Sequence, residues 1–151
     1  ILFTNKKSSL PNWLLWGLTL WALLHMMGGL VYLNGTRLYE LILINLINRG
    51  ELQIFRYDQF VHIIGFGVAT LVGYTLLERY LNEKTNWKVV SVLVVLIGMG
   101  IGAFNEIVEF LTVIIVPATG VGGYENTMMD LISNTIGAII AAIIITIKRN
   151  S

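Results

Sequence analysis

Four long apolar stretches constrain this sequence more than any other feature. They cover roughly residues 11–33, 57–80, 88–116 and 127–147. About 20 apolar residues in a helix are enough to cross the roughly 30 Å hydrocarbon layer of a bilayer. Backbone polar groups inside that layer must be paired within the protein, so stretches of this kind become helices. The sequence therefore predicts an all-α polytopic membrane protein with four transmembrane helices.

The composition agrees with a bilayer as the surroundings. Of the 151 residues, 56% are hydrophobic and only 13% are charged, and there is room for a single helical bundle but no second domain. The ten Lys and Arg are dispersed and the net charge is +1, so we expect no nucleic-acid partner. The absence of cysteine excludes disulfides and thiolate metal sites. Because the first residue is Ile1, we expect an incomplete N-terminus.

The connection between the first two stretches contains a shorter apolar segment, "RLYELILINLINRG", at residues 37–50. Its apolar part is too short to cross a bilayer, so we predict an interfacial or re-entrant helix there. Arg56 follows this segment, and we expect it to be a solvated loop residue. The last connection, residues 117–126, is rich in glycine and contains no basic residue.

The basic residues are divided unevenly between the two sides of the predicted bundle. Three fall on one side: Arg37, Arg49 and Arg56. The other seven fall on the side of the chain ends: Lys6, Lys7, Arg79, Lys84, Lys88, Lys148 and Arg149. Since Lys and Arg concentrate on the cytoplasmic side of membrane proteins, we expect both termini to be cytoplasmic.

Apart from Glu78, Arg79 and Lys88 at the span ends nearest the termini, six acids and histidines fall inside the predicted spans. All six lie in the half that is far from the termini when depth is counted at about 1.5 Å per residue. They are His25, Asp58, His62, Glu106, Glu109 and Asp130. Residues three or four apart share a helix face, so Asp58 with His62, Glu106 with Glu109, and Asp130 with Asn134 each form a one-sided group. Small residues at the same spacing (Gly98 and Gly102; Ser133, Gly137 and Ala141) predict close helix packing on these faces.

A charge in hydrocarbon costs at least about 2.5–3.5 kcal/mol, so something must neutralise this group. Imidazoles and carboxylates are ordinary ligands of zinc, iron and manganese, and the leading hypothesis is a divalent metal site with all six residues as ligands. Two other interpretations stay open. One is a structural hydrogen-bond network in which His62 donates to Glu106 or Asp130. The other is a proton or ion relay, although the half nearer the termini offers only hydroxyl side chains.

Four motifs together resemble a known family. They are "LHMMGG" (24–29), "RYDQFVHIIGFG" (56–67), "NEIVEF" (105–110) and "ENTMMDLISNTIGA" (125–138). Their order and spacing resemble the YjdF-like family of bacterial inner-membrane proteins over about residues 20–140, with a more distant similarity to VanZ-like proteins. The resemblance implies a location in the plasma (inner) membrane and a site at the six residues named above, but no substrate. Asn126 stands where that family has the first of two closing aspartates.

Two functions follow as hypotheses. The first is a membrane-embedded metal enzyme that acts on a lipid or lipid-linked substrate, with Glu106 or Asp130 as the base and the loop at residues 117–126 as a lid. The second is a non-catalytic accessory subunit of a larger membrane complex, in which the polar cluster is structural. An enzyme needs an open ligand position, whereas a structural site is closed.

Overall fold

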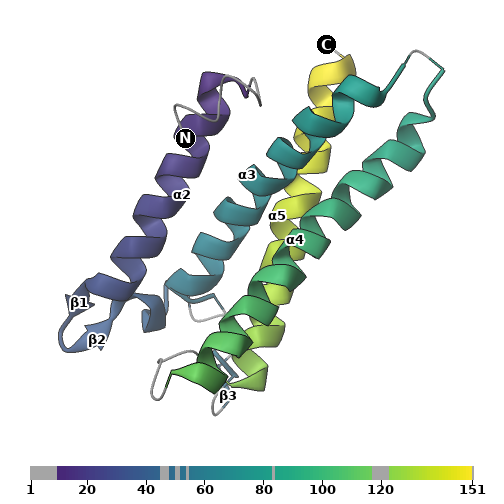
Figure 1. Ribbon diagram of the computed structural model, residues 1–151. Helices are drawn as coiled ribbons and strands as arrows, with labels where there is room; N and C mark the ends of the chain where they lie inside the picture. Colours follow the sequence, from purple (N-terminus) through teal and green to yellow (C-terminus); the bar gives the residue numbers. More distant parts are fainter. Residues whose placement is uncertain are drawn as a thin grey trace.

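The computed structural model describes residues 10–44, 48–49, 52–53, 55–82, 84–116 and 123–150. Within these residues, four long helices form one bundle: α2 (Asn12–Leu30), α3 (Tyr57–Leu77), α4 (Trp87–Ile115) and α5 (Tyr124–Asn150) (Figure 1). All four are long and apolar enough to cross a membrane, which confirms the predicted fold class. Each helix begins and ends within three residues of the stretch predicted for it.

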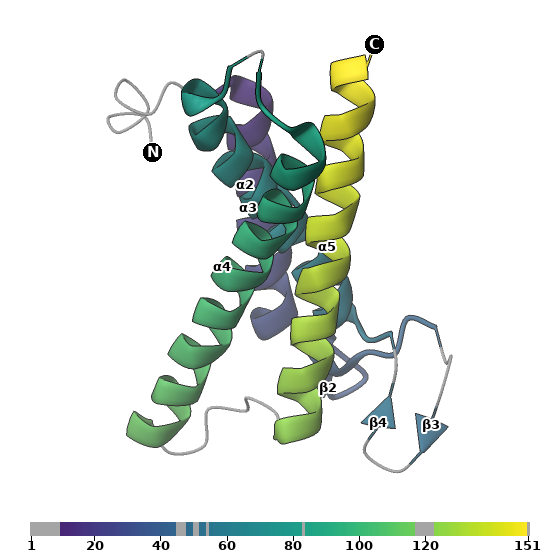
Figure 2. The same ribbon diagram turned by 90° about the vertical axis from the view of Figure 1, so that its right-hand side faces the viewer.

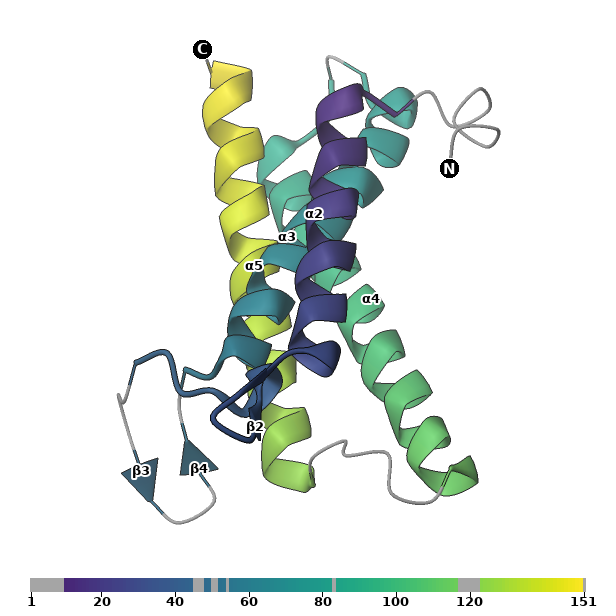
Figure 3. The same cartoon turned by 90° about the vertical axis from the view of Figure 1, so that its left-hand side faces the viewer.

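The bundle has two chemically different ends. The start of α2, the end of α5 and the short η2 turn (Glu78–Tyr80) lie together at one end, which we call the termini end (Figure 2). The short strands β1 (Tyr32–Leu33), β2 (Thr36–Arg37), β3 (Asn48–Arg49) and β4 (Leu52–Gln53) lie at the opposite end, which we call the hairpin end (Figure 1 and Figure 3). α3 occupies the centre, where it packs against α2, α4 and α5. The polar side chains of α3 therefore meet neighbours on all sides.

Close packing of α3, α4 and α5 follows the small residues. A Cβ atom added to Gly137 of α5 would collide with the carbonyl oxygen of Ile63 and lie 2.8 Å from the backbone nitrogen of Gly67 in α3. A Cβ atom on Gly102 of α4 would lie 2.8 Å from the side chain of Asn134. These positions require glycine because a neighbouring helix occupies the space that a side chain would need. The predicted ridges are thus the packing faces.

The connection between α2 and α3 differs from the predicted interfacial helix, and that prediction was wrong for the described residues. The structure has two short hairpins and a 3-10 turn instead: β1 (Tyr32–Leu33) with β2 (Thr36–Arg37), η1 (Leu38–Glu40), and β3 (Asn48–Arg49) with β4 (Leu52–Gln53). The physical reason is that the backbone of residues 41–44 forms hydrogen bonds with residues 55–57 instead of within a helix. The N–H groups of Leu43 and Ile44 donate to the carbonyl of Phe55. The N–H of Tyr57 donates to the carbonyl of Leu41 at 2.8 Å.

Turn chemistry explains how this connection folds back on the bundle. Asn34 and Gly35 have positive φ angles of 51° and 82°, which are the values of an Asn-Gly hairpin turn. After the turn, Leu38 is buried against Tyr57 and Val61 of α3. The segment therefore packs into the bundle and does not lie along the membrane surface as a separate helix.

Gly137→Ala should weaken the fold at the contact between α3 and α5. Because the added methyl group collides with the backbone at Ile63, we expect the free energy of unfolding in detergent to fall by about 1–3 kcal/mol. Gly100→Ala is the control, because nothing lies within 4 Å of a Cβ atom placed there. Equal unfolding free energies for the two variants would contradict the packing described here.

Candidate metal centre

A tightly held turn positions the first residues of α3. The buried side chain of Gln59 accepts hydrogen bonds from the backbone N–H groups of Phe55 at 2.6 Å and Arg56 at 3.1 Å. Phe55 has a φ of 76°, a left-handed conformation that costs a non-glycine residue about 1–2 kcal/mol, and Gln59 helps to hold it there. Asp58 lies in the first turn, where the helix dipole favours a negative charge. Asp58 and His62 consequently lie on successive turns that face α5.

His62 lies at the centre of the site, and one of its ring nitrogens is already engaged. Its Nδ1 atom lies 2.9 Å from Oδ1 of Asn134, and the ring stacks on Phe66 with 5.6 Å between centroids. The amide nitrogen of Asn134 donates to Oε1 of Glu106 at 3.3 Å, so the amide oxygen faces His62 and accepts from Nδ1–H. In a neutral imidazole with a protonated Nδ1, the Nε2 atom carries a lone pair. The hydrogen bond to Asn134 thus leaves Nε2 as the ring nitrogen that could bind a metal ion.

The Nε2 side of His62 faces the carboxylate of Asp58, and Asp130 lies close to both residues. Oδ1 of Asp58 lies 3.6 Å from Nε2, and one ligand atom each from Asp58, His62 and Asp130 lie within 4.8 Å of one another. A separation of 3.6 Å exceeds the roughly 2.7–2.9 Å of a charged hydrogen bond. It is close to the roughly 3.4 Å between two ligands of a tetrahedral zinc ion with bonds of about 2.1 Å. The three side chains have the donors and the spacing of a metal site.

Asp130 provides a second observation that points to a ligand. Its side chain is buried, at 1% exposure, and Oδ2 accepts a hydrogen bond of 2.6 Å from Asn126. Oδ1 is also buried and has no hydrogen-bond partner within the described part of the chain. Leaving a buried carboxyl oxygen without a partner is costly. A cation between Asp130 and His62 would supply the missing interaction.

Asn126 joins the two carboxylates of this group. Besides its hydrogen bond to Asp130, its amide nitrogen lies 3.5 Å from Oδ2 of Asp58. Arg56 also acts on the site, because it is only partly exposed and its charge is close enough to influence the Asp130 carboxylate. The expectation that Arg56 is a solvated loop residue was therefore wrong: it precedes α3 directly, is only partly exposed and forms a backbone bridge with Ile42.

A second group of possible ligands shares His62. It consists of His62, Glu106 and Glu109, again with one ligand atom each within 4.8 Å. Oε1 of Glu106 lies 3.7 Å from Nδ1 of His62, while Oε1 of Glu109 accepts from Asn105 at 2.7 Å. Nδ1, the His62 nitrogen nearest to Glu106, is already engaged by Asn134. Of the two groups, the one that contains Asp130 therefore has the better geometry for a candidate metal site.

His25 is the one predicted ligand that the structure leaves out of both groups. It is exposed on α2, and its ring contacts Tyr39 edge to face with 5.6 Å between centroids. The Tyr39 hydroxyl donates to the backbone carbonyl of His25 at 2.7 Å. Burial, and then the charges of Asp58 and Glu109, raise the pKa of the Tyr39 phenol well above its ordinary value, so the hydroxyl stays protonated. Tyr39, not His25, is the neighbour of the cluster on this side.

The structure therefore brings together five of the six predicted ligands: Asp58, His62, Glu106, Glu109 and Asp130. Sequence reasoning missed the connecting roles of Asn126 and Asn134. A signal for both was present, because each lies four residues from Asp130 and hence on its face of α5. No comparable signal pointed to Tyr39, which reaches the site through the fold of the connection.

The hydroxyl side chains toward the termini end are occupied within their own helices. Thr70, Thr75 and Ser91 donate to the carbonyls four residues before them, at 2.6, 2.8 and 3.0 Å. They therefore do not extend the polar cluster toward the termini end. This arrangement disfavours a proton or ion relay that crosses the membrane along these side chains.

Comparison with protein families places the chain among membrane proteins. The model of the family described as "Predicted membrane protein (DUF2238)" matches residues 1–151. The chain belongs to this family. No curated protein and no solved structure matches the chain. Membership of the DUF2238 family agrees with the four long apolar helices, and the chain is an integral membrane protein. The family is described only as membrane proteins, and this description includes no activity.

Asn134→Ala should destabilise the bundle, because it leaves the Nδ1 atom of His62 and a carboxylate oxygen of Glu106 without their partner. We expect the free energy of unfolding to fall by about 2–4 kcal/mol, measured by denaturation in detergent. Asn105→Ala is the control, since it removes an amide that is only half-buried and should cost less. A loss that is no larger at Asn134 than at Asn105 would argue against a central role for Asn134.

Proposed function

We propose that this protein binds a divalent metal ion inside its helical bundle, with Asp58, His62 and Asp130 as the ligands. The observation that carries the proposal is the buried Oδ1 atom of Asp130, which lacks a hydrogen-bond partner within the described residues and belongs to the group around His62. One imidazole and two carboxylates, with no thiolate, suit zinc, iron or manganese. Glu106 and Asn134 would support the site by orienting His62.

We further propose that the centre acts on a lipid or lipid-linked substrate. Three protein ligands leave a position for water on a tetrahedral ion, and a metal bound there would lower the pKa of that water toward neutrality. Of the two carboxylates predicted as a base, Asp130 serves as a ligand in this proposal, which leaves Glu106 for that role. The side chain of Asp58 is 19% exposed, so this ligand lies nearest to an approaching substrate.

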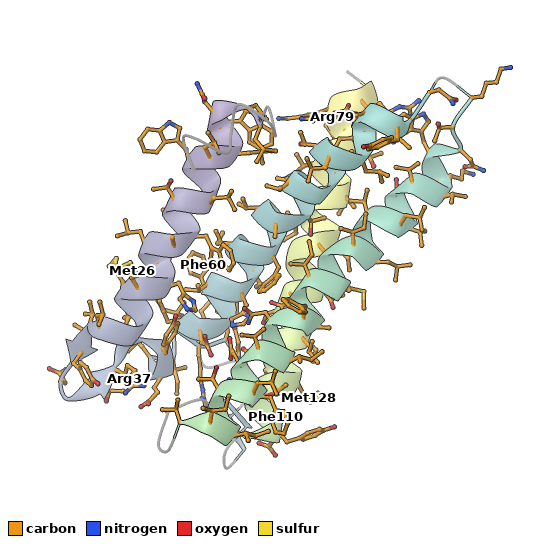
Figure 4. All side chains as sticks on the ribbon, in the orientation of Figure 1. Met26, Arg37, Phe60, Arg79, Phe110 and Met128 are labelled. Carbon is orange, nitrogen blue, oxygen red and sulfur yellow. The ribbon has the colours of Figure 1, made fainter. Side chains whose placement is uncertain are left out.

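The surroundings of Glu106 favour a lipid substrate. Phe104 and Phe110 of α4 flank the two glutamates and are 66% and 63% exposed (Figure 4 labels Phe110). In a bilayer such side chains contact acyl chains. Most of the loop proposed as a lid, residues 117–122, lies outside the described residues, and its role stays a prediction.

For the location we propose the plasma (inner) membrane, with both termini cytoplasmic. Arg79 lies at the termini end and Arg37 at the hairpin end (Figure 4). The other basic side chains described at the termini end are Lys84, Lys88, Lys148 and Arg149, and this imbalance supports the orientation. Lys6 and Lys7 lie outside the described residues. The likeness to YjdF-like and VanZ-like proteins supports the same location and remains a prediction.

A second candidate is a non-catalytic accessory subunit with a structural polar network. One observation favours it: hydrogen bonds from His62 to Asn134 and from Asn134 to Glu106 join α3, α5 and α4 in series. A network of this kind would hold the helices together without a metal. Metal content separates the two candidates.

Purified wild-type protein should contain zinc, iron or manganese at close to one ion per chain, measured by inorganic mass spectrometry. His62→Ala and Asp130→Asn should lose the ion, because each removes a ligand atom. Glu125→Gln should keep it, since Glu125 is an exposed acid in the first turn of the same helix as Asp130. Chelation should lower the thermal stability of the wild type but not that of Asp130→Asn.

Two results would contradict the metal proposal. One is a wild type without stoichiometric metal after purification and after incubation with each of the three ions. The other is the same metal content in Asp130→Asn and Glu125→Gln. If the variants in the cluster then melt earlier than the wild type, the structural network of the accessory subunit becomes the better account.

Glu106→Gln should keep the metal but bind it more weakly. Glu106 is not one of the three proposed ligands; it fixes the Asn134 amide, and through it the protonated nitrogen of His62. Changes to such supporting residues typically cost about 10–100-fold in metal affinity. Affinity is measured by competition with a chelator, with Asn105→Gln as the control near the other glutamate. Complete loss of metal in Glu106→Gln would instead make Glu106 a ligand.

A further inference from the structure

A second polar site lies at the termini end. It is roughly 24 Å from His62, counted along α3 to Glu78 at about 1.5 Å per residue. α2 and α3 pack closely at Gly17, where an added Cβ atom would lie 3.2 Å from Val68. Beyond this contact, a cavity of about 470 Å³ lies between α2, α3, α5 and the start of α4. This volume is in the range of ordinary ligand sites. We call it the basic pocket.

Two cations are held at the rim of the basic pocket by aromatic rings. Nζ of Lys148 lies 4.8 Å from the centre of the Trp13 ring, and Cζ of Arg149 lies 3.8 Å from that of Trp87. All four residues line the cavity. A cation over an aromatic face is attracted to it, so the rings restrict where these flexible side chains place their charges. The rim therefore presents two cationic side chains, each held in position as a hydrogen-bond donor.

The other residues that line the basic pocket combine a polar part with an apolar part, which suits an amphiphilic ligand. The carboxylate of Glu78 accepts a hydrogen bond of 3.0 Å from Tyr74, and it is the one acid among the lining residues, so the cations outnumber it two to one. Deeper in the cavity the wall is apolar and consists of Leu71, Ile144 and Ile145. A ligand with a negatively charged head and a hydrocarbon tail matches both parts.

The depth of the pocket agrees with this chemistry. Trp13 and Trp87 belong to the aromatic residues near the ends of the spans, and such residues mark the level of the lipid headgroups. Glu78 and Leu71 are seven residues apart on α3, which corresponds to roughly 10 Å along the helix. The pocket thus extends from the headgroup level into the acyl region of the bilayer.

We propose that the basic pocket binds an anionic glycerophospholipid, with Lys148 and Arg149 on the phosphate and an acyl chain along Ile144 and Ile145. Arg and Lys are the usual donors to phosphate oxygens, and basic residues beside a membrane attract anionic lipids. The inference is independent of the metal centre, which lies at the other end of the bundle and shares no residue with the pocket.

Native mass spectrometry of the full chain, released from nanodiscs of phosphatidylcholine with phosphatidylglycerol, tests the proposal. The wild type should retain phosphatidylglycerol in preference to phosphatidylcholine. Lys148→Gln with Arg149→Gln should weaken retention about tenfold or more, because two charge-assisted contacts are lost. Lys84→Gln with Lys88→Gln is the matched control. It removes the same charge at the same end from exposed residues that do not line the pocket.

A second variant keeps the test independent of the charges. Ile144→Trp fills the apolar wall while both cations remain, and it should also weaken retention of phosphatidylglycerol. Equal retention of the two lipids by the wild type, or equal losses in the two double variants, would overturn the proposal. A competition experiment with glycerol phosphate tests whether the ligand is a soluble phosphate compound. If it competes with the lipid at similar concentrations, the ligand is a soluble phosphate compound and the lipid assignment is wrong.

Discussion

The close approach of α3 and α5 is the contact on which the rest of the structure depends. Gly137 and Gly67 leave the two backbones almost touching, with only 3.3 Å between the Gly137 carbonyl oxygen and the place where a Gly67 Cβ would lie. Such proximity, one to two turns from His62 and Asp130, brings side chains from different helices within hydrogen-bonding reach. With larger residues here, the polar groups would face lipid, where they are costly.

Asparagine side chains stabilise the cluster of acids in this bundle. Asn105, Asn126 and Asn134 each donate a hydrogen bond to a carboxylate. An amide satisfies a carboxylate oxygen without adding a charge, so negative charge remains for a cation. The buried Oδ1 atom of Asp130 is the place where this pairing stops. The amides therefore satisfy most of the cluster from within the protein, and Oδ1 of Asp130 is left for the proposed metal ion.

The two ends of the bundle present different chemistry to the membrane. Acids and one histidine gather in the half toward the hairpin end, while Lys148 and Arg149 line a cavity at the termini end. The apolar middle separates them, since its hydroxyl groups are bonded within their own helices. The acidic cluster and the basic pocket are therefore separate polar sites within one bundle.

Much of this arrangement could be predicted from the sequence, because it depends on local spacing. Apolar length determined the four spans, and helical periodicity determined the depth and face of Asp58, His62 and Asp130. Tertiary structure alone decided which faces meet. It left His25 outside the cluster. It also placed the Asn134 amide oxygen against Nδ1 of His62, and this contact favours a proton on Nδ1. It also paired the backbone of the described residues in the 37–50 segment, because hydrogen bonds with the residues before α3 outweighed a short isolated helix. Such long-range pairing leaves no local pattern in a sequence.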